Sequence, residues 1–397
     1  MLDSEYDVVV VGGGPGGSAT AKRCAELGLK VAMLEKRLSI GSEKRCGEGL
    51  SADAVEKLGQ KIPRYCIMQD INGSLVYAPN GKKITIDYGK TAGYVLERKQ
   101  YDKWLAEEAA RAGAKVQAKT YVTGVRKEND FVKGVDAEFE GDRFSINSKV
   151  VVAADGVESK VARWAGMNTT NKLINIDSGF QFEMVDIEMD DPHKIILYFG
   201  NEIAKRGYCW IFPKGEDKAN VGIGIGGLGG YGKTARQFLE EWIKTMPGLN
   251  KGSITEVNAG GIPVGGFLDN MVMNGLVVVG DAAHQVNPIH GGGMKEAAIA
   301  GKIAGEVIAE GIKANDVSQK KLSKYNDIWW KERGVHLQKV QKLREVIEKM
   351  NDDDFNMLVD ALSGADLVDF THGGSLGKLA KILMKKPKLA LLARHLL

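Results

Sequence analysis

Residues 7–17 read Asp-Val-Val-Val-Val-Gly-Gly-Gly-Pro-Gly-Gly, a short β-branched run that ends in a cluster of glycines. Because β-branched residues favour strands, Asp7–Val11 predicts a short strand. Ser18–Leu27 is rich in helix-forming residues, and Lys30–Glu35 again has the composition of a strand. The stretch therefore predicts a βαβ unit with the glycines at the turn from strand to helix.

The glycines of this turn have the spacing GxGxxG, at Gly12, Gly14 and Gly17. In a dinucleotide-binding unit the first glycine permits the tight turn, the second lets a pyrophosphate approach the backbone, and the third lets helix and strand pack closely. The helix N-terminus offers N–H groups to phosphates, and Glu35 can accept hydrogen bonds from ribose hydroxyls. A merely structural turn is disfavoured because strand, helix and acidic residue occur together. We expect cofactor contacts from Gly12, Gly14, Pro15, Gly16, Gly17, Glu35 and Lys36.

Composition excludes several classes of protein. The 54 basic and 51 acidic residues give a net charge of +3, too balanced to suggest nucleic acid as a partner. Four scattered cysteines without a CxxC pair argue against a disulfide scaffold or a metal site and favour a reducing, cytoplasmic compartment. We expect no signal peptide, and no uncharged apolar run is long enough to span a bilayer.

After the first unit the pattern changes from βαβ to strand-rich. A helix at Tyr101–Ala112 is followed by the expected strands Lys115–Val125, Phe131–Phe139 and Arg143–Ala154. Four further strand candidates between residues 180 and 226 are separated by polar or Gly-rich turns, which predicts a separate antiparallel sheet.

The apolar run Leu276–Val279 then predicts a return to the parallel sheet, and a helix is expected from Gly293 to about Glu310. The chain beyond it is mainly helical in composition. We therefore expect an α/β fold, a Rossmann-type cofactor-binding fold with an inserted antiparallel sheet and a helical C-terminal region. The expected divisions are 1–170 and 271–312 for the two parts of the cofactor domain, 171–270 for the substrate domain, and 313–397 for the helical region.

A second motif identifies the dinucleotide. Gly280-Asp281 follows the apolar run and places a carboxylate at a strand end, where ribityl hydroxyls could donate to it. Gly291–Met294 then opens a helix whose positive end favours negative charge on a flavin. Here the sequence resembles the p-hydroxybenzoate hydroxylase superfamily of FAD proteins, whose GD motif this segment matches. The resemblance implies FAD as the cofactor.

The resemblance covers most of the first 310 residues or so and includes two weaker motifs. Arg98 and Asp102 look like the superfamily's arginine near the ribose and its helix aspartate. Asp155-Gly156 looks like its DG motif, although this pair alone is equally typical of a turn. The cofactor-binding residues expected in this part of the chain are Arg98, Val122, Asp155, Gly156, Gly280, Asp281, Gly291, Gly292, Gly293 and Met294.

A strand rich in aromatic residues indicates which family within this superfamily the sequence resembles. Strand alternation puts Tyr208, Trp210 and Phe212 on one face, while Gly222 and Gly224 leave a bare face on the probable partner strand. Together they could line a long apolar slot, although the same period is equally typical of aromatic packing in an ordinary core. The pattern YxWxFP with a later GxG resembles the geranylgeranyl reductases, and the arrangement is most similar to the archaeal members that act on digeranylgeranylglycerophospholipid. We therefore expect these five residues to bind substrate.

The loop after the first unit contains Arg45-Cys46-Gly47-Glu48-Gly49. In the reductase family a Cys-Gly loop at this point lies near the flavin, so the resemblance makes Cys46 a candidate catalytic residue and Cys46 and Gly47 candidate flavin contacts. A small buried cysteine in a glycine-rich turn is an equal alternative, and Glu48 is as well explained as a solvated charge. His290 is a second catalytic candidate, although a structural histidine is the simpler interpretation. We expect His284 to support the fold.

The resemblance implies an FAD-dependent reductase of isolated C=C bonds in the geranylgeranyl chains of membrane lipid precursors. Hydride would come from flavin N5, and the proton from Cys46, water or the flavin. The expected partners are a geranylgeranylated glycerophospholipid, an electron donor (ferredoxin or NAD(P)H) and a membrane surface. Two alternatives remain open, an NAD(P)H-dependent aromatic monooxygenase and a non-catalytic prenyl-binding escort.

The end of the chain carries a local excess of positive charge, with six Lys or Arg and no Asp or Glu between Gly373 and Leu397. Apolar residues alternate with these lysines, which predicts an amphipathic helix that attaches the enzyme to the inner face of the cell membrane. A helix docked on the protein's own surface is the alternative.

Overall fold

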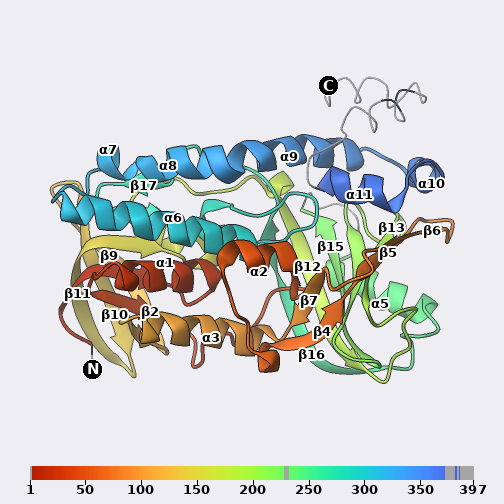
Figure 1. Ribbon diagram of the computed structural model, residues 1–397, viewed down its shortest axis with the longest axis horizontal. Helices are drawn as coiled ribbons and strands as arrows, with labels where there is room; N and C mark the ends of the chain where they lie inside the picture. Colours follow the sequence, from red (N-terminus) through yellow and green to blue (C-terminus); the bar gives the residue numbers. More distant parts are fainter. Residues whose placement is uncertain (1, 228–231, 372–380, 382–383, 385–397) are drawn as a thin grey trace.

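The computed structural model describes residues 2–227 and 232–371, together with residues 381 and 384. An eight-stranded sheet forms one half of the molecule and a seven-stranded sheet the other, with a small three-stranded sheet between the strands of the first unit and the second sheet (Figure 1). The C-terminal segment for which membrane attachment is predicted lies outside the described residues. None of the helices in the described part combines the length and apolar character that a bilayer-spanning helix needs.

The eight-stranded sheet contains the predicted βαβ unit. Its central order is β17-β18-β11-β1-β2-β8, and β11 also pairs with β10, which pairs with β9. The neighbours β18, β11, β1, β2 and β8 are parallel. Their central segments are apolar and buried, as expected for strands covered on both faces: residues 8–11, 31–34, 150–153 and 276–278. The strands are β1 (Glu5–Val11), β2 (Val31–Leu34), β8 (Lys115–Gln117), β9 (Thr120–Glu128), β10 (Phe131–Phe139), β11 (Asp142–Ala153), β17 (Val272–Met273) and β18 (Leu276–Val278).

One predicted strand in this sheet is wrong in detail. The expected strand Lys115–Val125 is two strands, because Lys119 adopts a left-handed conformation (φ 55°) that interrupts the extended chain. β8 stays beside β2 in the parallel sheet, whereas β9 turns away and pairs antiparallel with β10.

The seven-stranded sheet has the order β16-β12-β15-β14-β13-β5-β6. The inserted antiparallel sheet is thus confirmed, with one parallel pair, β13 with β5. A buried apolar cluster that includes Phe182, Leu239 and Trp242 joins one face to α5 (Ala235–Thr245), and the other face looks toward the eight-stranded sheet. The strands are β5 (Gly73–Tyr77), β6 (Lys83–Asp87), β12 (Ile176–Val185), β13 (Lys194–Phe199), β14 (Tyr208–Pro213), β15 (Lys218–Gly226) and β16 (Ser253–Pro263).

Residues 49–96 contain elements that were not expected from the sequence. This stretch forms the three-stranded sheet β3-β7-β4 and also contributes β5 and β6 to the second sheet. The chain therefore crosses from the first sheet to the second before the expected insertion begins. The elements are β3 (Gly49–Ser51), α2 (Ala52–Leu58), η1 (Arg64–Cys66), β4 (Ile67–Ile71) and β7 (Gly93–Leu96).

The C-terminal region is helical, as predicted, and is fastened to the second sheet by Arg344. Its guanidinium donates to the carbonyl oxygen of Val264 and pairs with Asp177 of β12, both at 2.9 Å. The helices are α7 (Gln319–Leu322), α8 (Lys324–Trp329), the π-helix η5 (Trp330–Gly334), α9 (Val335–Ile347), α10 (Asp352–Ala361) and α11 (Gly364–Thr371). Shorter elements near the first sheet are η2 (Gly156–Glu158), α4 (Lys160–Trp164), η3 (Leu173–Asn175) and η4 (Gly280–Ala283).

Three helices lie side by side on the first sheet, with α1 (Pro15–Glu26) between α3 (Arg98–Arg111) and α6 (Met294–Lys313) (Figure 1). Glycines bring α6 close to α1. A Cβ at Gly301 would lie 2.4 Å from the carbonyl oxygen of Gly16, and one at Gly305 would lie 2.7 Å from Cβ of Arg23. This contact fixes the N-termini of α1 and α6 relative to each other.

Gly301→Val tests that contact. The valine side chain would clash with the backbone of α1, which can shift only at a large energetic cost. We therefore expect the free energy of unfolding to fall by about 3 kcal/mol, measured by urea denaturation followed by circular dichroism. Lys302→Val on the exposed face of the same helix controls for helix propensity and should cost less than about 1 kcal/mol. Equal losses in the two variants would contradict the close approach of α1 and α6.

Candidate active site

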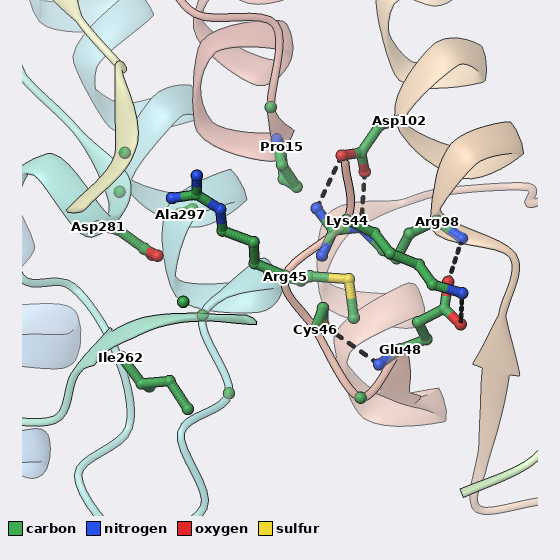
Figure 2. Close-up of a pocket in the computed structure, with 18 of the residues that line it drawn as sticks. Pro15, Lys44, Arg45, Cys46, Glu48, Arg98, Asp102, Ile262, Asp281 and Ala297 are labelled. Carbon is green, nitrogen blue, oxygen red and sulfur yellow. Dashed lines mark hydrogen bonds and ion pairs between the residues drawn. The ribbon is translucent and has the colours of Figure 1, made fainter. Parts of the chain in front are cut away.

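A single cavity of about 770 Å³ runs from the glycine turn after β1 to the aromatic face of β14. Its wall includes the loop 41–49, the segment between β18 and α6, and residues of the second sheet (Figure 2). All the cofactor-binding residues predicted from the sequence line it, as do Cys46, His290, Tyr208, Trp210 and Phe212. Gly222 and Gly224 do not.

The glycine turn has the geometry that the spacing predicts. Gly12 has φ 112°, and a Cβ there would lie 2.2 Å from the carbonyl oxygen of Ala154. A Cβ at Gly17 would lie 2.0 Å from the carbonyl oxygen of Gly12, so helix and strand meet without side chains. A Cβ at Gly14 would meet no atom within 4 Å, because this residue faces the cavity. The turn thus leaves open backbone at the N-terminus of α1, which is the arrangement that a pyrophosphate requires.

Glu35 follows β2 and is oriented by the backbone around it. Its carboxylate accepts hydrogen bonds from the N–H groups of Gly13 (2.9 Å) and Arg37 (3.0 Å). Lys36 pairs with Glu158 across the cavity mouth at 3.4 Å. The carboxylate is therefore held at the end of the glycine turn.

The opposite wall brings two buried carboxylates to the cavity. Burial raises the pKa of Asp281, which follows β18, and only partial compensation comes from Arg98 and His284. Burial likewise raises the pKa of Asp155, whose Oδ1 has no hydrogen-bond partner among the described residues. Buried carboxylate oxygens without a full set of donors can accept hydrogen bonds from the hydroxyl groups of a bound nucleotide. The residues present therefore fit FAD.

The aromatic face of β14 forms the far end of the cavity. The ring centroids of Tyr208 and Trp210 lie 5.8 Å apart and those of Trp210 and Phe212 lie 6.3 Å apart. Tyr208 pairs with Gly224 and Trp210 with Gly222 in register, and the Trp210 ring covers both glycines. The predicted aromatic face is therefore present, but its two glycines lie beneath the ring of Trp210 instead of lining the cavity.

The loop with Cys46 lies between the two ends. Cys46 Sγ accepts a hydrogen bond from the N–H of Glu48 (3.2 Å), and the ring of Phe212 occupies the space where a Cβ of Gly47 would lie. Nearby, the Arg98 guanidinium donates to both carboxylate oxygens of Asp102, at 2.8 and 2.7 Å. The thiol side of this loop faces the cavity (Figure 2).

The two histidines differ in their surroundings. His290 lines the cavity, where its Nδ1 accepts from the N–H of Gly292 (3.1 Å) and its carbonyl oxygen accepts from the Tyr208 hydroxyl (2.9 Å). His284 is buried, with its ring nitrogens 2.6 and 3.1 Å from the carbonyl oxygens of Gly266 and Thr169. The interpretation of His284 as a residue that supports the fold is confirmed.

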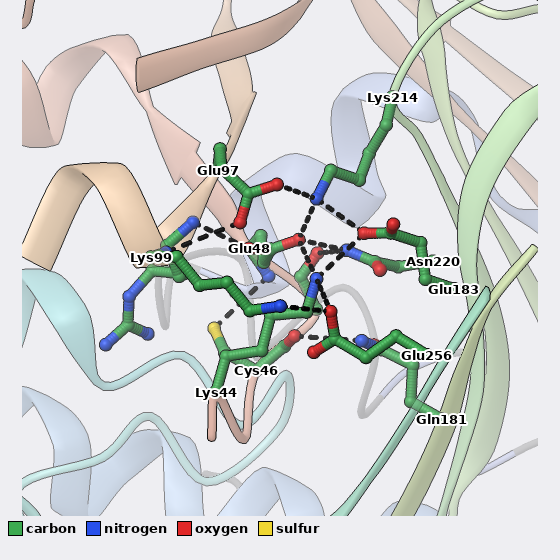
Figure 3. A network of polar contacts seen from close by, with 12 residues as sticks. Lys44, Cys46, Glu48, Glu97, Lys99, Gln181, Glu183, Lys214, Asn220 and Glu256 are labelled. Atoms are coloured by element: carbon green, nitrogen blue, oxygen red, sulfur yellow. Dashed lines mark hydrogen bonds and ion pairs between the residues drawn. The ribbon is translucent and has the colours of Figure 1, made fainter. Parts of the chain in front are cut away.

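A buried network of charges, which sequence analysis missed, holds the Cys46 loop from behind (Figure 3). Glu48 has a fully buried side chain and a left-handed backbone (φ 76°), so it is not a solvated charge. Its Oε2 accepts from Lys214 Nζ (2.8 Å), Lys44 Nζ (3.1 Å) and Asn220 Nδ2 (2.5 Å), and its Oε1 accepts from the N–H of Arg98 (2.7 Å).

Glu183 of β12 completes the network by pairing with Lys44 (2.9 Å) and Lys214 (2.8 Å). Burial would lower the pKa of Lys214, but Glu48, Glu183 and Glu97 more than offset this and raise it. Burial would raise the pKa of Glu183, but hydrogen bonds from Lys214, Lys218 and Lys44 lower it well below its usual range. Both groups are therefore charged at neutral pH.

The fold is that of the FAD-dependent oxidoreductases, and the cavity lies where such a fold holds its cofactor. A flavin-dependent brominase has the same fold, with a TM-score of 0.75 and 19% identity over 93% of this chain and 94% of the brominase. A structure from Thermoplasma acidophilum, described as geranylgeranyl bacteriochlorophyll reductase-like, superposes with a TM-score of 0.90 and 36% identity over 99% of this chain and 100% of that one.

Sequence comparison identifies the family. Residues 175–262 match the family model described as "Geranylgeranyl reductase catalytic domain", and residues 7–198 match the one described as "Lycopene cyclase protein". The digeranylgeranylglycerophospholipid reductase of Methanocella arvoryzae is 43% identical, covering 93% of this chain and 94% of its own. That of Methanocaldococcus jannaschii is 41% identical, covering 98% and 97%. The chain belongs to the digeranylgeranylglycerophospholipid reductase family.

Lys214→Met tests the contribution of the buried network. The change removes one positive partner of the buried carboxylates of Glu48 and Glu183, and solvent does not reach them to compensate. We therefore expect the free energy of unfolding, measured by urea denaturation, to fall by about 3–5 kcal/mol. Lys324→Met removes a comparable pair with Glu310 (2.6 Å) in which both side chains are about half exposed, and should cost less than about 1 kcal/mol. A loss for Lys214→Met as small as that of the control would show that the network does not stabilise the fold.

Proposed function

We propose that the chain binds FAD at the glycine-turn end of the cavity and reduces isolated C=C bonds in the geranylgeranyl chains of a glycerophospholipid. The observation that carries this proposal is the continuity of the cavity from the open backbone at Gly14 to the aromatic face of β14. A nucleotide and an apolar chain can therefore meet within one space. Family membership favours a reductase over the aromatic monooxygenase and the prenyl-binding escort.

In this proposal the glycine turn and the N-terminus of α1 bind the pyrophosphate, and Glu35 accepts from ribose hydroxyls. Asp281 and Asp155 accept from hydroxyl groups further along the cofactor, and the N-terminus of α6, preceded by Gly291–Gly293, faces the flavin ring. Reduced FAD supplies the hydride for one carbon of the alkene. The remaining contacts that we propose for it are Lys36, Cys46, Gly47, Arg98 and Val122.

The second carbon of the alkene needs a proton, for which we propose the thiol of Cys46. The thiol lies in the wall between the proposed flavin end and the aromatic face, and His290, which also lines the cavity, is the other candidate. Tyr208, Trp210 and Phe212 would bind the isoprenoid chain by apolar contact and exclude water from the reacting alkene. As further partners we propose ferredoxin or NAD(P)H as electron donor and a membrane surface.

The test is whether the reduced enzyme reduces the lipid when oxygen is absent. Chemically reduced holoenzyme is incubated anaerobically with digeranylgeranyl glycerophospholipid, and we expect mass spectrometry to show lipid masses raised by pairs of hydrogen atoms. Oxidised holoenzyme without reductant is the control. An unchanged lipid together with flavin that stays reduced would refute the proposed reaction.

Gly14→Val tests the cofactor site. The branched side chain would project into open space at present, but it would occupy the path of the pyrophosphate, so we expect at least about a hundredfold weaker FAD binding. Flavin fluorescence titration of the apoprotein measures it, and circular dichroism checks that the variant is folded. Gly124→Val is the control, because this glycine of β9 has no positive φ, its Cβ would meet only Asp136 Oδ2 at 3.6 Å, and it does not line the cavity. Full flavin occupancy in folded Gly14→Val would place the cofactor elsewhere.

A further inference from the structure

A row of residues crosses the second sheet from the aromatic face to the Cys46 loop. Gln181 of β12 lies opposite Gly222 of β15, and Gly222 lies opposite Trp210 of β14. These three positions are neighbours in register on three adjacent strands. Because side chains alternate along a strand, Trp210 and Gln181 point to the same face of the sheet, the one that lines the cavity.

The missing side chain of Gly222 lets the two outer residues meet across the strand between them. A Cβ at Gly222 would lie 2.4 Å from Cε2 and 2.6 Å from Nε1 of Trp210, so the indole lies directly over this backbone. Its Nε1–H donates a hydrogen bond to Oε1 of Gln181 at 2.9 Å, and the contact is buried. Residue 222 must therefore be glycine, because any side chain there would occupy the space through which the indole reaches Gln181.

The indole fixes which way the Gln181 amide points. Indole Nε1 can only donate, so the amide atom that it contacts must be the oxygen. The amide nitrogen is then directed to the loop, where it donates to the carbonyl oxygen of Cys46 at 3.1 Å (Figure 3). Gln181 is 3% exposed, so losing either bond costs more than it would at the surface.

We propose that Gln181 is a positioning residue that couples Trp210, in the lipid-facing wall, to the main chain of Cys46. This inference rests on the proposed function, in which Cys46 supplies a proton and Trp210 contacts the isoprenoid. An isoprenoid that presses on the indole acts through one amide on the residue that bears the thiol. Loss of the link should lower kcat and leave the KM for lipid nearly unchanged, because the apolar wall remains.

The first test measures the thiol itself and needs no lipid. Holoenzyme is treated with iodoacetamide, and peptide mass spectrometry follows the alkylation of Cys46. With its carbonyl released, the loop should open more often, so we expect Gln181→Met to raise the alkylation rate about fivefold, as the loss of one buried hydrogen bond implies. Trp210→Phe should raise it in the same direction, because it frees the Gln181 amide to turn.

The second test distinguishes coupling from simple packing. If Trp210 acts on Cys46 through Gln181, the effects of Gln181→Met and Trp210→Phe on alkylation are not multiplicative, and the double variant resembles Gln181→Met alone. Tyr208→Phe is the matched control, since its hydroxyl donates to His290 and not to Gln181. Its effect should multiply with that of Gln181→Met.

Unchanged alkylation in folded Gln181→Met, or multiplicative effects with Trp210→Phe, would overturn the proposal and leave Gln181 with a structural role only. If Gln181→Met does not fold, as judged by bound flavin and circular dichroism, Gln181→Asn takes its place. Its shorter side chain cannot span both partners, so it should also raise the alkylation rate. Alkylation does not depend on turnover, so an enzyme that reduces no lipid leaves this test intact.

Discussion

The arrangement of the site depends on the hydrogen bonds and ion pairs that the carboxylate of Glu48 makes. This carboxylate is buried, and it accepts from the ammonium groups of Lys44 and Lys214, the amide of Asn220 and the N–H of Arg98. These donors come from the loop itself, from the second sheet and from the start of α3. Because an isolated buried charge is very unfavourable, all of these segments must be in place together. The Cys46 loop follows the first βαβ unit in sequence, yet it is held chiefly by the second sheet.

The cavity wall is shaped by rings that lie against backbone without side chains. Phe212 packs on Gly47 and Gly49, and Trp210 packs on Gly222. Each ring therefore lies directly on backbone that strand pairing or the Glu48 contacts already hold in place. The shape of the aromatic face consequently depends on the absence of side chains beneath it as much as on the rings themselves.

The sequence predicts local elements well and distant partners poorly. The first βαβ unit, the GD segment and the alternation in β14 are visible because strand and helix periods and glycine spacing act over a few residues. The break between β8 and β9 depends on the left-handed conformation of one residue, Lys119, and a lysine gives no sequence signal for that conformation. The burial of Glu48 could not be predicted because its partner Lys214 lies 166 residues further along the chain. β5 was also missed, although it pairs with the adjacent β6, and its place in the second sheet could not be predicted because its other partner, β13, comes much later.

The parallel pairing of β5 with β13 has a consequence for biosynthesis. At roughly 5–20 residues per second, a ribosome completes β5 on the order of ten seconds before it completes β13. Throughout that interval the only sheet partner available to β5 is β6, and the edge of β5 that β13 will cover is open to pairing with another extended chain. Short strands limit the hazard, because β5 offers only five residues to a wrong partner. The edge of β5 is therefore open to such pairing until β13 has been made, which is a cost of a parallel pair whose two strands lie far apart in sequence.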